Sequence, residues 1–65
     1  MKIVLNGEPR EIRAAALDEA LAELGFAGVT VATAINGGFV PAPARPATRL
    51  AEGDRVEVLA PRQGG

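Results

Sequence analysis

The 65-residue sequence contains no cysteine, histidine, serine, tyrosine or tryptophan. Without cysteine it has neither a disulfide framework nor a thiolate metal site, which fits a reducing compartment. The usual general base is missing, and so are the usual nucleophiles, apart from Lys2, three threonines and scattered carboxylates. Histidine-based metal sites are excluded as well. We therefore predict no catalytic residues and no metal site, and expect the chain to be a substrate or carrier for other proteins.

Long apolar runs and an excess of one charge are also absent. Seven basic and eight acidic side chains give a net charge of −1, and the arginines form no run and have almost no aromatic partners. This pattern argues against nucleic-acid binding. No apolar stretch is long enough to span a membrane, and Met1 and Lys2 lead into a strand-like segment rather than a signal peptide. We expect one cytoplasmic domain.

The first 13 residues indicate a hairpin. In residues 2–6, Ile3 and Leu5 fall on one face and Lys2, Val4 and Asn6 on the other, as in a half-buried strand. Asn6-Gly7 follows, and both residues tolerate the positive φ of tight hairpin turns. The return strand is predicted over 9–13 with Ile12 pointing inward, and Pro9, which has no N–H, places it at a sheet edge.

An amphipathic helix is predicted next, because Leu17, Ala20, Leu21 and Leu24 form one apolar stripe at helical spacing. Gly25 is well placed to end it. No side chain suited to cap the helix precedes it, so its first residue is left open within a couple of positions.

The second half indicates three further strands. Residues 31–36 alternate, Asn36-Gly37 is a second hairpin signal, and 39–40 begin a short return strand. The last strand is predicted over 55–59, and Pro61 ends its pairing because proline lacks the donor.

The proline-rich segment 41–46 (PAPARP) is predicted to be a stiff surface connection, neither strand nor helix, with Leu50 closing it against the core. The order of elements then predicts an α+β fold of the β-grasp type, a mixed sheet of four to five strands with one helix packed on one face. We assign residues 1–59 to this β-grasp domain and residues 60–65 to a flexible C-terminal Gly-Gly tail.

The chain stops at Gly64-Gly65, an unhindered α-carboxylate with no Cβ on either residue. Its pKa of about 3.3–3.7 makes it an anion at neutral pH, able to attack an activated phosphate. The six-residue tail reaches about 20 Å when extended, enough to thread a narrow channel. The alternative is an ordinary frayed terminus of small residues.

Several features together resemble the ubiquitin-like sulfur carriers, and among them the ThiS-type carriers of thiamine thiazole synthesis. They are Ala-Ile-Asn-Gly at 34–37 before a short strand, Gly53-Asp54 before Arg-Val-Glu-Val, and the terminal Gly64-Gly65. The resemblance implies that an E1-like adenylating enzyme uses ATP and Mg to convert the Gly65 carboxylate into an acyl-adenylate. A persulfide from a cysteine-desulfurase relay would then leave a thiocarboxylate, and thiazole synthase would take the sulfur. The chain itself would bind no cofactor.

The tail and one sheet face are the predicted contacts with these partners. Arg62, Gln63 and Gly64 would thread into the partner. The predicted partner-binding patch consists of the apolar residues that alternation places on the sheet face away from the helix: Val4, Ala32, Ala34 and Leu59. The alternative is that these side chains are ordinary surface. Pro61-Arg62-Gln63 is less apolar than the tail usual in such carriers, which bears on partner choice.

Three other functions remain open. The same chemistry at Gly65 serves sulfur carriers for molybdopterin, a thiolated tRNA base or an amino acid. A protein modifier would instead join Gly65 to a lysine by an isopeptide bond. A β-grasp interaction module would carry the tail incidentally.

Overall fold

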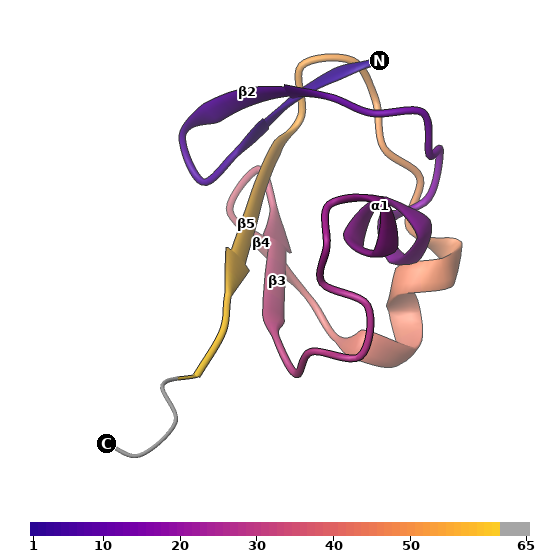
Figure 1. Cartoon of the computed structure of the whole chain (residues 1–65), viewed down its shortest axis with the longest axis vertical. Coiled ribbons are helices and arrows are strands. Elements are labelled where there is room, and N and C mark those ends of the chain that lie inside the picture. Colours follow the sequence, from indigo (N-terminus) through magenta and orange to yellow (C-terminus); the bar gives the residue numbers. More distant parts are fainter. Residues whose placement is uncertain (62–65) are drawn as a thin grey trace.

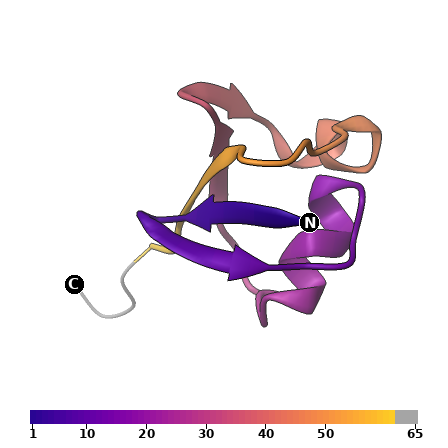
Figure 2. The ribbon, with the colours of Figure 1, turned by 90° about the horizontal axis from the view of Figure 1, so that it is seen from above.

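The computed structural model describes residues 1–61, in which one helix packs on one face of a mixed sheet (Figure 1). The elements are β1 (Lys2–Leu5), β2 (Glu8–Glu11), α1 (Leu17–Glu23), β3 (Ala32–Ile35), β4 (Gly38–Val40), the 3₁₀ helix η1 (Ala42–Ala47) and β5 (Arg55–Leu59). The strand order is β2-β1-β5-β3-β4, with β1 and β5 parallel and the other neighbours antiparallel. Seen from above, α1 and η1 lie on the same side of the sheet (Figure 2). The predicted α+β β-grasp fold is confirmed.

Both hairpins have the two-residue turns that the sequence predicts. Asn6 and Gly7 have φ values of 48° and 86°, and Asn36 and Gly37 have values of 50° and 85°. Positive φ at both central residues defines the type I′ turn, whose twist matches that of the flanking strands. The turns set the register, pairing Leu5 with Glu8 and Ile35 with Gly38.

The first return strand was predicted over 9–13, but β2 runs from Glu8 to Glu11. A two-residue turn starts the strand immediately after Gly7, and Pro9 lies on the sheet edge as expected. At the other end, the amide of Arg13 leaves the ladder and donates to the Glu23 carboxylate at 2.9–3.0 Å. The Ala14 amide donates to the same carboxylate at 3.0 Å. These amide donors, Arg13 first, lower the pKa of Glu23 below its ordinary value of 4.5.

Helix α1 buries the apolar stripe that predicted it. Leu17, Ala20 and Leu21 are buried, while Leu24 is half-buried at the C-cap. No side chain caps the N-terminus, and Gly25, with φ of 96°, ends the helix in the left-handed conformation that glycine adopts without strain.

The core lies between α1 and the sheet, and Leu50 closes it from the connection before β5. The buried sheet and loop residues are Ile3, Leu5, Ile12, Val56 and Val58, with Val31, Ile35 and Val40 partly buried beside them. One buried polar side chain, Thr33, lies among them within the described part of the chain. Its hydroxyl donates to the Val40 carbonyl at 2.7 Å and accepts from Arg45 Nε at 3.1 Å, so burial leaves no polar atom unpaired.

The prediction for segment 41–46 was wrong in part, because the 3₁₀ helix η1 spans Ala42–Ala47. Proline is compatible with so short a helix. Pro43 lies in the first turn, where an amide has no helical partner, and Pro46 lies inside the helix. At the two ends, the Ala44 amide donates to the Pro41 carbonyl and the Thr48 amide to the Arg45 carbonyl. Arg45 then joins η1 to β3 through its bond to Thr33, and it also donates to the carbonyl of Val31, the residue before β3, at 2.6 Å.

Candidate functional site

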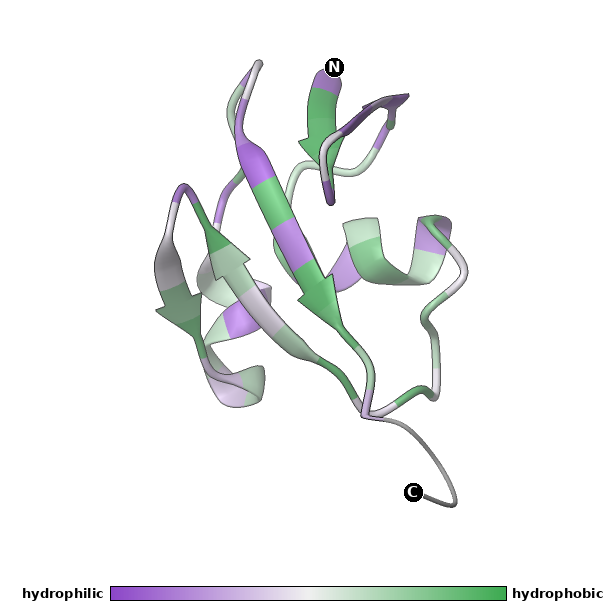
Figure 3. Ribbon diagram, turned by 90° about the vertical axis from the view of Figure 1, so that its left-hand side faces the viewer, coloured by the Kyte–Doolittle hydropathy of each residue, from purple (hydrophilic) through white to green (hydrophobic). Residues whose placement is uncertain are grey.

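Strand β5 leads to the C-terminal tail and lies in the middle of the sheet, between β1 and β3. Its side chains alternate, with Val56 and Val58 buried in the core and Arg55, Glu57 and Leu59 exposed on the opposite face. Figure 3 shows this alternation as bands of hydrophilic and hydrophobic colour along the strand. The face that β5 presents to solvent therefore carries both charged and apolar side chains. Each of them lies at a set position along the strand relative to the start of the tail.

Asn6 holds the end of β5. The backbone pairing of β1 ends here, with the Asn6 amide donating to the Val56 carbonyl at 2.9 Å. The Asn6 side chain then continues the ladder: Oδ1 accepts from the Val58 amide at 2.9 Å and Nδ2 donates to the Val58 carbonyl at 3.1 Å. Positive φ turns the backbone of Asn6 away, and the side-chain oxygen takes the place that its own carbonyl would occupy in a continued ladder.

Asn36 does the same at the start of β5. Its backbone amide donates to the Arg55 carbonyl at 2.8 Å, and its Oδ1 accepts from the Arg55 amide at 2.9 Å. Its Nδ2 donates to Asp54 Oδ1 at 3.0 Å. We call Asn6 and Asn36 the asparagine clamps, since one fixes each end of β5 from a hairpin turn.

The predicted partner-binding patch lies on the face away from α1, as alternation indicated. Leu59 is 73% exposed and Ala32 is exposed opposite it, while Ala34 and Val4 are half-buried. The structure brings Ala32, Ala34 and Leu59 together around one shallow hollow of about 350 Å³. Val4 lines a second hollow, beside Arg55. The residues thus share a face but belong to two adjacent depressions.

Sequence reasoning missed Phe39 as a member of this face. Phe39 lies on β4 and pairs with Ala34 of β3. It is 71% exposed and lines the same hollow as Leu59. The signal was available, because a two-residue turn at Asn36-Gly37 places Phe39 opposite Ala34 and hence on the outward face. Exposed aromatic side chains are enriched at protein interfaces, so Phe39 adds to the case for this face as a docking surface.

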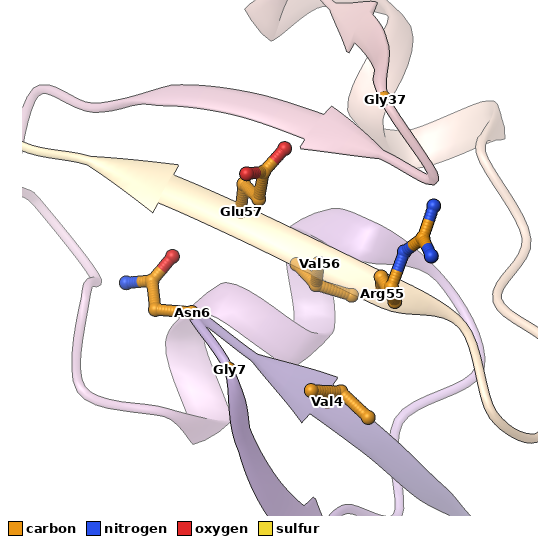
Figure 4. Close-up of a pocket in the computed structure, with 7 residues that line it drawn as sticks. All are labelled: Val4, Asn6, Gly7, Gly37, Arg55, Val56 and Glu57. Atoms are coloured by element: carbon orange, nitrogen blue, oxygen red, sulfur yellow. The ribbon is translucent and has the colours of Figure 1, made fainter.

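The other half of the face is polar. Arg55 and Glu57 line a hollow of about 330 Å³ together with Val4, Asn6, Gly7 and Gly37. Figure 4 shows the two charged side chains standing on β5 between the two Asn-Gly turns. The face therefore changes from charged to apolar along β5, in the direction of the tail.

A third hollow, lined by Thr30, Val31, Ala32, Leu59 and Pro61, lies where the described chain ends. The predicted threading residues Arg62, Gln63 and Gly64, and the reactive Gly65, lie outside the described residues, as does most of the predicted 60–65 tail. Their roles stay predictions, and so does the division of the chain at residue 59.

Within residues 1–61 no three His, Cys, Asp or Glu side chains are grouped in a way that suits a metal ion. The same residues include no helix that is long and apolar enough to cross a membrane.

Comparison with known proteins decides the family. The model of the ThiS family matches residues 3–65. The chain belongs to the ThiS family.

Two solved structures support the membership. A crystal structure of the thiamine biosynthesis protein (ThiS) from Geobacter metallireducens is 32% identical, with 100% of both chains covered and a TM-score of 0.82. An NMR solution structure of a thiamine biosynthesis protein from Geobacter metallireducens is 32% identical, covering 100% of this chain and 88% of that one, with a TM-score of 0.80. A search of curated proteins gives no significant match. The ThiS resemblance drawn from the sequence is thus confirmed.

Proposed function

We propose that this ThiS-family protein is a sulfur carrier for thiazole synthesis, and that the carried sulfur is held at Gly65. The observation that carries the proposal is the family match, which extends through the terminal Gly64-Gly65. The residue inventory supports it, since a chain without cysteine, histidine or serine has few groups with which to catalyse a reaction. The conversions at Gly65 are then the work of partner enzymes, and we place them in the cytoplasm.

The proposed chemistry has three steps. An oxygen of the Gly65 carboxylate attacks the α-phosphorus of ATP, and pyrophosphate leaves. A persulfide sulfur from the cysteine-desulfurase relay then attacks the acyl carbon and displaces AMP, and reduction of the S–S bond by a thiol leaves a thiocarboxylate. Thiazole synthase accepts the sulfur. The adenylating enzyme holds ATP and Mg, because a carboxylate needs a good leaving group and the transferring phosphate needs cationic stabilisation.

Two glycines at the end suit this chemistry. Without a Cβ, the acyl carbon of Gly65 is open to attack from both faces, and the backbone of Gly64 fits a narrow channel that a side chain would block. Arg62 and Gln63 carry the chain from the body to that channel.

The body must supply docking energy. Ordering six tail residues costs about 1–2 kcal/mol each, so roughly 6–12 kcal/mol must be offset by contacts elsewhere. We propose that the partner-binding patch (Val4, Ala32, Ala34 and Leu59), with Phe39 added, makes those contacts with the adenylating enzyme and with thiazole synthase. Leu59 and Phe39 are exposed and share a hollow with Ala32 and Ala34, and Leu59 is the last residue of β5 before the tail, which supports this role.

Intact-mass spectrometry of the protein purified from its native cell tests the proposal. We expect a fraction of the chain heavier by the difference between sulfur and oxygen, with the change mapped to Gly65. A matched chain lacking Gly65 should show neither the mass change nor thiazole formation with the purified partners. Delivery of sulfur by the shortened chain would overturn the proposal. Gly65 joined to lysines of other proteins would instead identify a modifier.

A further inference from the structure

We propose that the order of charges on the outward face of β5, Arg55 and then Glu57, sets the direction in which the protein docks on its adenylating partner. The inference rests on the proposed function and names the chemistry of the partner surface. That surface carries a carboxylate facing Arg55 and a cation facing Glu57, followed by apolar side chains facing Leu59, in order toward the mouth of its channel.

The two charges are free to meet a partner. Both residues are exposed, and within residues 1–61 neither side chain forms an ion pair or a hydrogen bond with another group. Residues i and i+2 of a strand lie on one face about 7 Å apart. Within residues 1–61 the two side chains form no ion pair with each other, so each charge can face a separate charged group on another protein.

The surroundings make the hollow accessible. Gly7 and Gly37 lie on its two sides and have no side chains to cover it (Figure 4). Val4 lies beside Arg55 across the β1–β5 pairing. A partner side chain can therefore reach the charges from above the sheet.

The backbone under the charges is held in place. The Arg55 amide donates to Asn36 Oδ1 at 2.9 Å, and Val58, the residue after Glu57, is held by Asn6. The two charges, Leu59 and the start of the tail thus form one fixed series along β5. A body docked in the reverse direction would place like charges together, and like-charge contact across an interface is strongly unfavourable.

Charge reversal separates order from net charge. The test variants are Arg55→Glu, Glu57→Arg and the double variant that exchanges the two residues and so keeps the net charge. The matched control exchanges Glu8 and Arg10, an exposed i, i+2 pair of the same two charges on β2. These residues pair with the buried Leu5 and Ile3, so they lie on the other face of the sheet.

The measurement is ATP-dependent pyrophosphate release by the adenylating enzyme from the same organism, with this protein as the varied substrate. At low salt we expect each single reversal and the Arg55/Glu57 exchange to raise KM about tenfold or more, with kcat within about twofold. The Glu8/Arg10 exchange should change KM by less than about twofold. High salt should shrink the differences, because ions screen exposed charges.

Unfolding midpoints in urea check that each variant is folded. The neutral variants Arg55→Gln and Glu57→Gln replace any variant that is not. For these we expect a smaller rise in KM, of about threefold. An exchange variant equal to wild type would overturn the inference, because only net charge would then matter. Unchanged single variants would overturn it too. If the wild-type protein is not adenylated at all, the proposed function is wrong and the inference falls with it. A failure of the inference alone looks different, because the wild-type protein is then adenylated and the variants behave like it.

Discussion

Removing the Asn6 clamp should loosen the end of β5 selectively. Asn6→Gly keeps the positive φ of 48° available without strain but deletes both side-chain bonds to Val58. The amide and carbonyl of Val58 point toward β1, which has already turned away, so no backbone partner replaces them. At about 0.5–1.5 kcal/mol net for each bond, the loss is about 1–3 kcal/mol. A domain of this size then melts lower by about 4–8 °C for each kcal/mol.

Urea unfolding and amide hydrogen exchange measure the effect. We expect a lower unfolding midpoint and faster exchange at Val58, while buried α1 amides change only as far as global stability falls. Asn36→Gly is the matched control, because it deletes the equivalent acceptor for the Arg55 amide in a turn of the same type. It should speed exchange at Arg55 rather than at Val58. Unchanged stability together with unchanged exchange at Val58 in Asn6→Gly would refute the role of the clamp.

Two further predictions concern the helix connection and the docking face. Folding lowers the pKa of Glu23 below 4.5, because the ionised carboxylate accepts hydrogen bonds in the folded state. The carboxylate therefore stabilises the fold at pH values above 4.5, and this contribution is lost as the pH falls through the folded-state pKa. Glu23→Gln should therefore be less stable than wild type at pH 7, with the two urea midpoints converging in acid; a difference independent of pH would contradict this. Leu59→Asp should fold normally, since the side chain is 73% exposed, yet lose most adenylation. Val29→Asp, at 47% exposure in the loop before β3, is its control, and a folded Leu59→Asp protein with normal adenylation would count against the partner-binding patch.

Local patterns predicted most of the fold because each acts over a few residues. The Asn-Gly pairs required positive φ and so specified tight turns, and those turns set the registers of both hairpins. The stripe from Leu17 to Leu24 predicted a helix on the correct face, although the helix ends one residue earlier. Alternation placed Leu59 outward and Val58 inward correctly.

The parts that sequence reasoning missed depend on contacts between distant residues. Asn6 and Val58 are separated by 52 positions, so nothing near Asn6 indicates that its side chain completes a ladder. In η1, the anchoring of Arg45 to Val31 and Thr33 is likewise a tertiary contact, and local proline content alone suggested an irregular segment. Phe39 was a different case, because applying the turn register to Ala34 would have placed it on the outward face.

The central position of β5 has a mechanical consequence. If a partner draws the C-terminus into a channel, as we propose, it pulls along the axis of a strand flanked by β1 on one side and β3 on the other. The load falls in shear on the bonds to both neighbours at once, rather than peeling an edge strand away bond by bond. Under the proposed function, the sheet would then resist such a pull better than it would if the tail followed an edge strand.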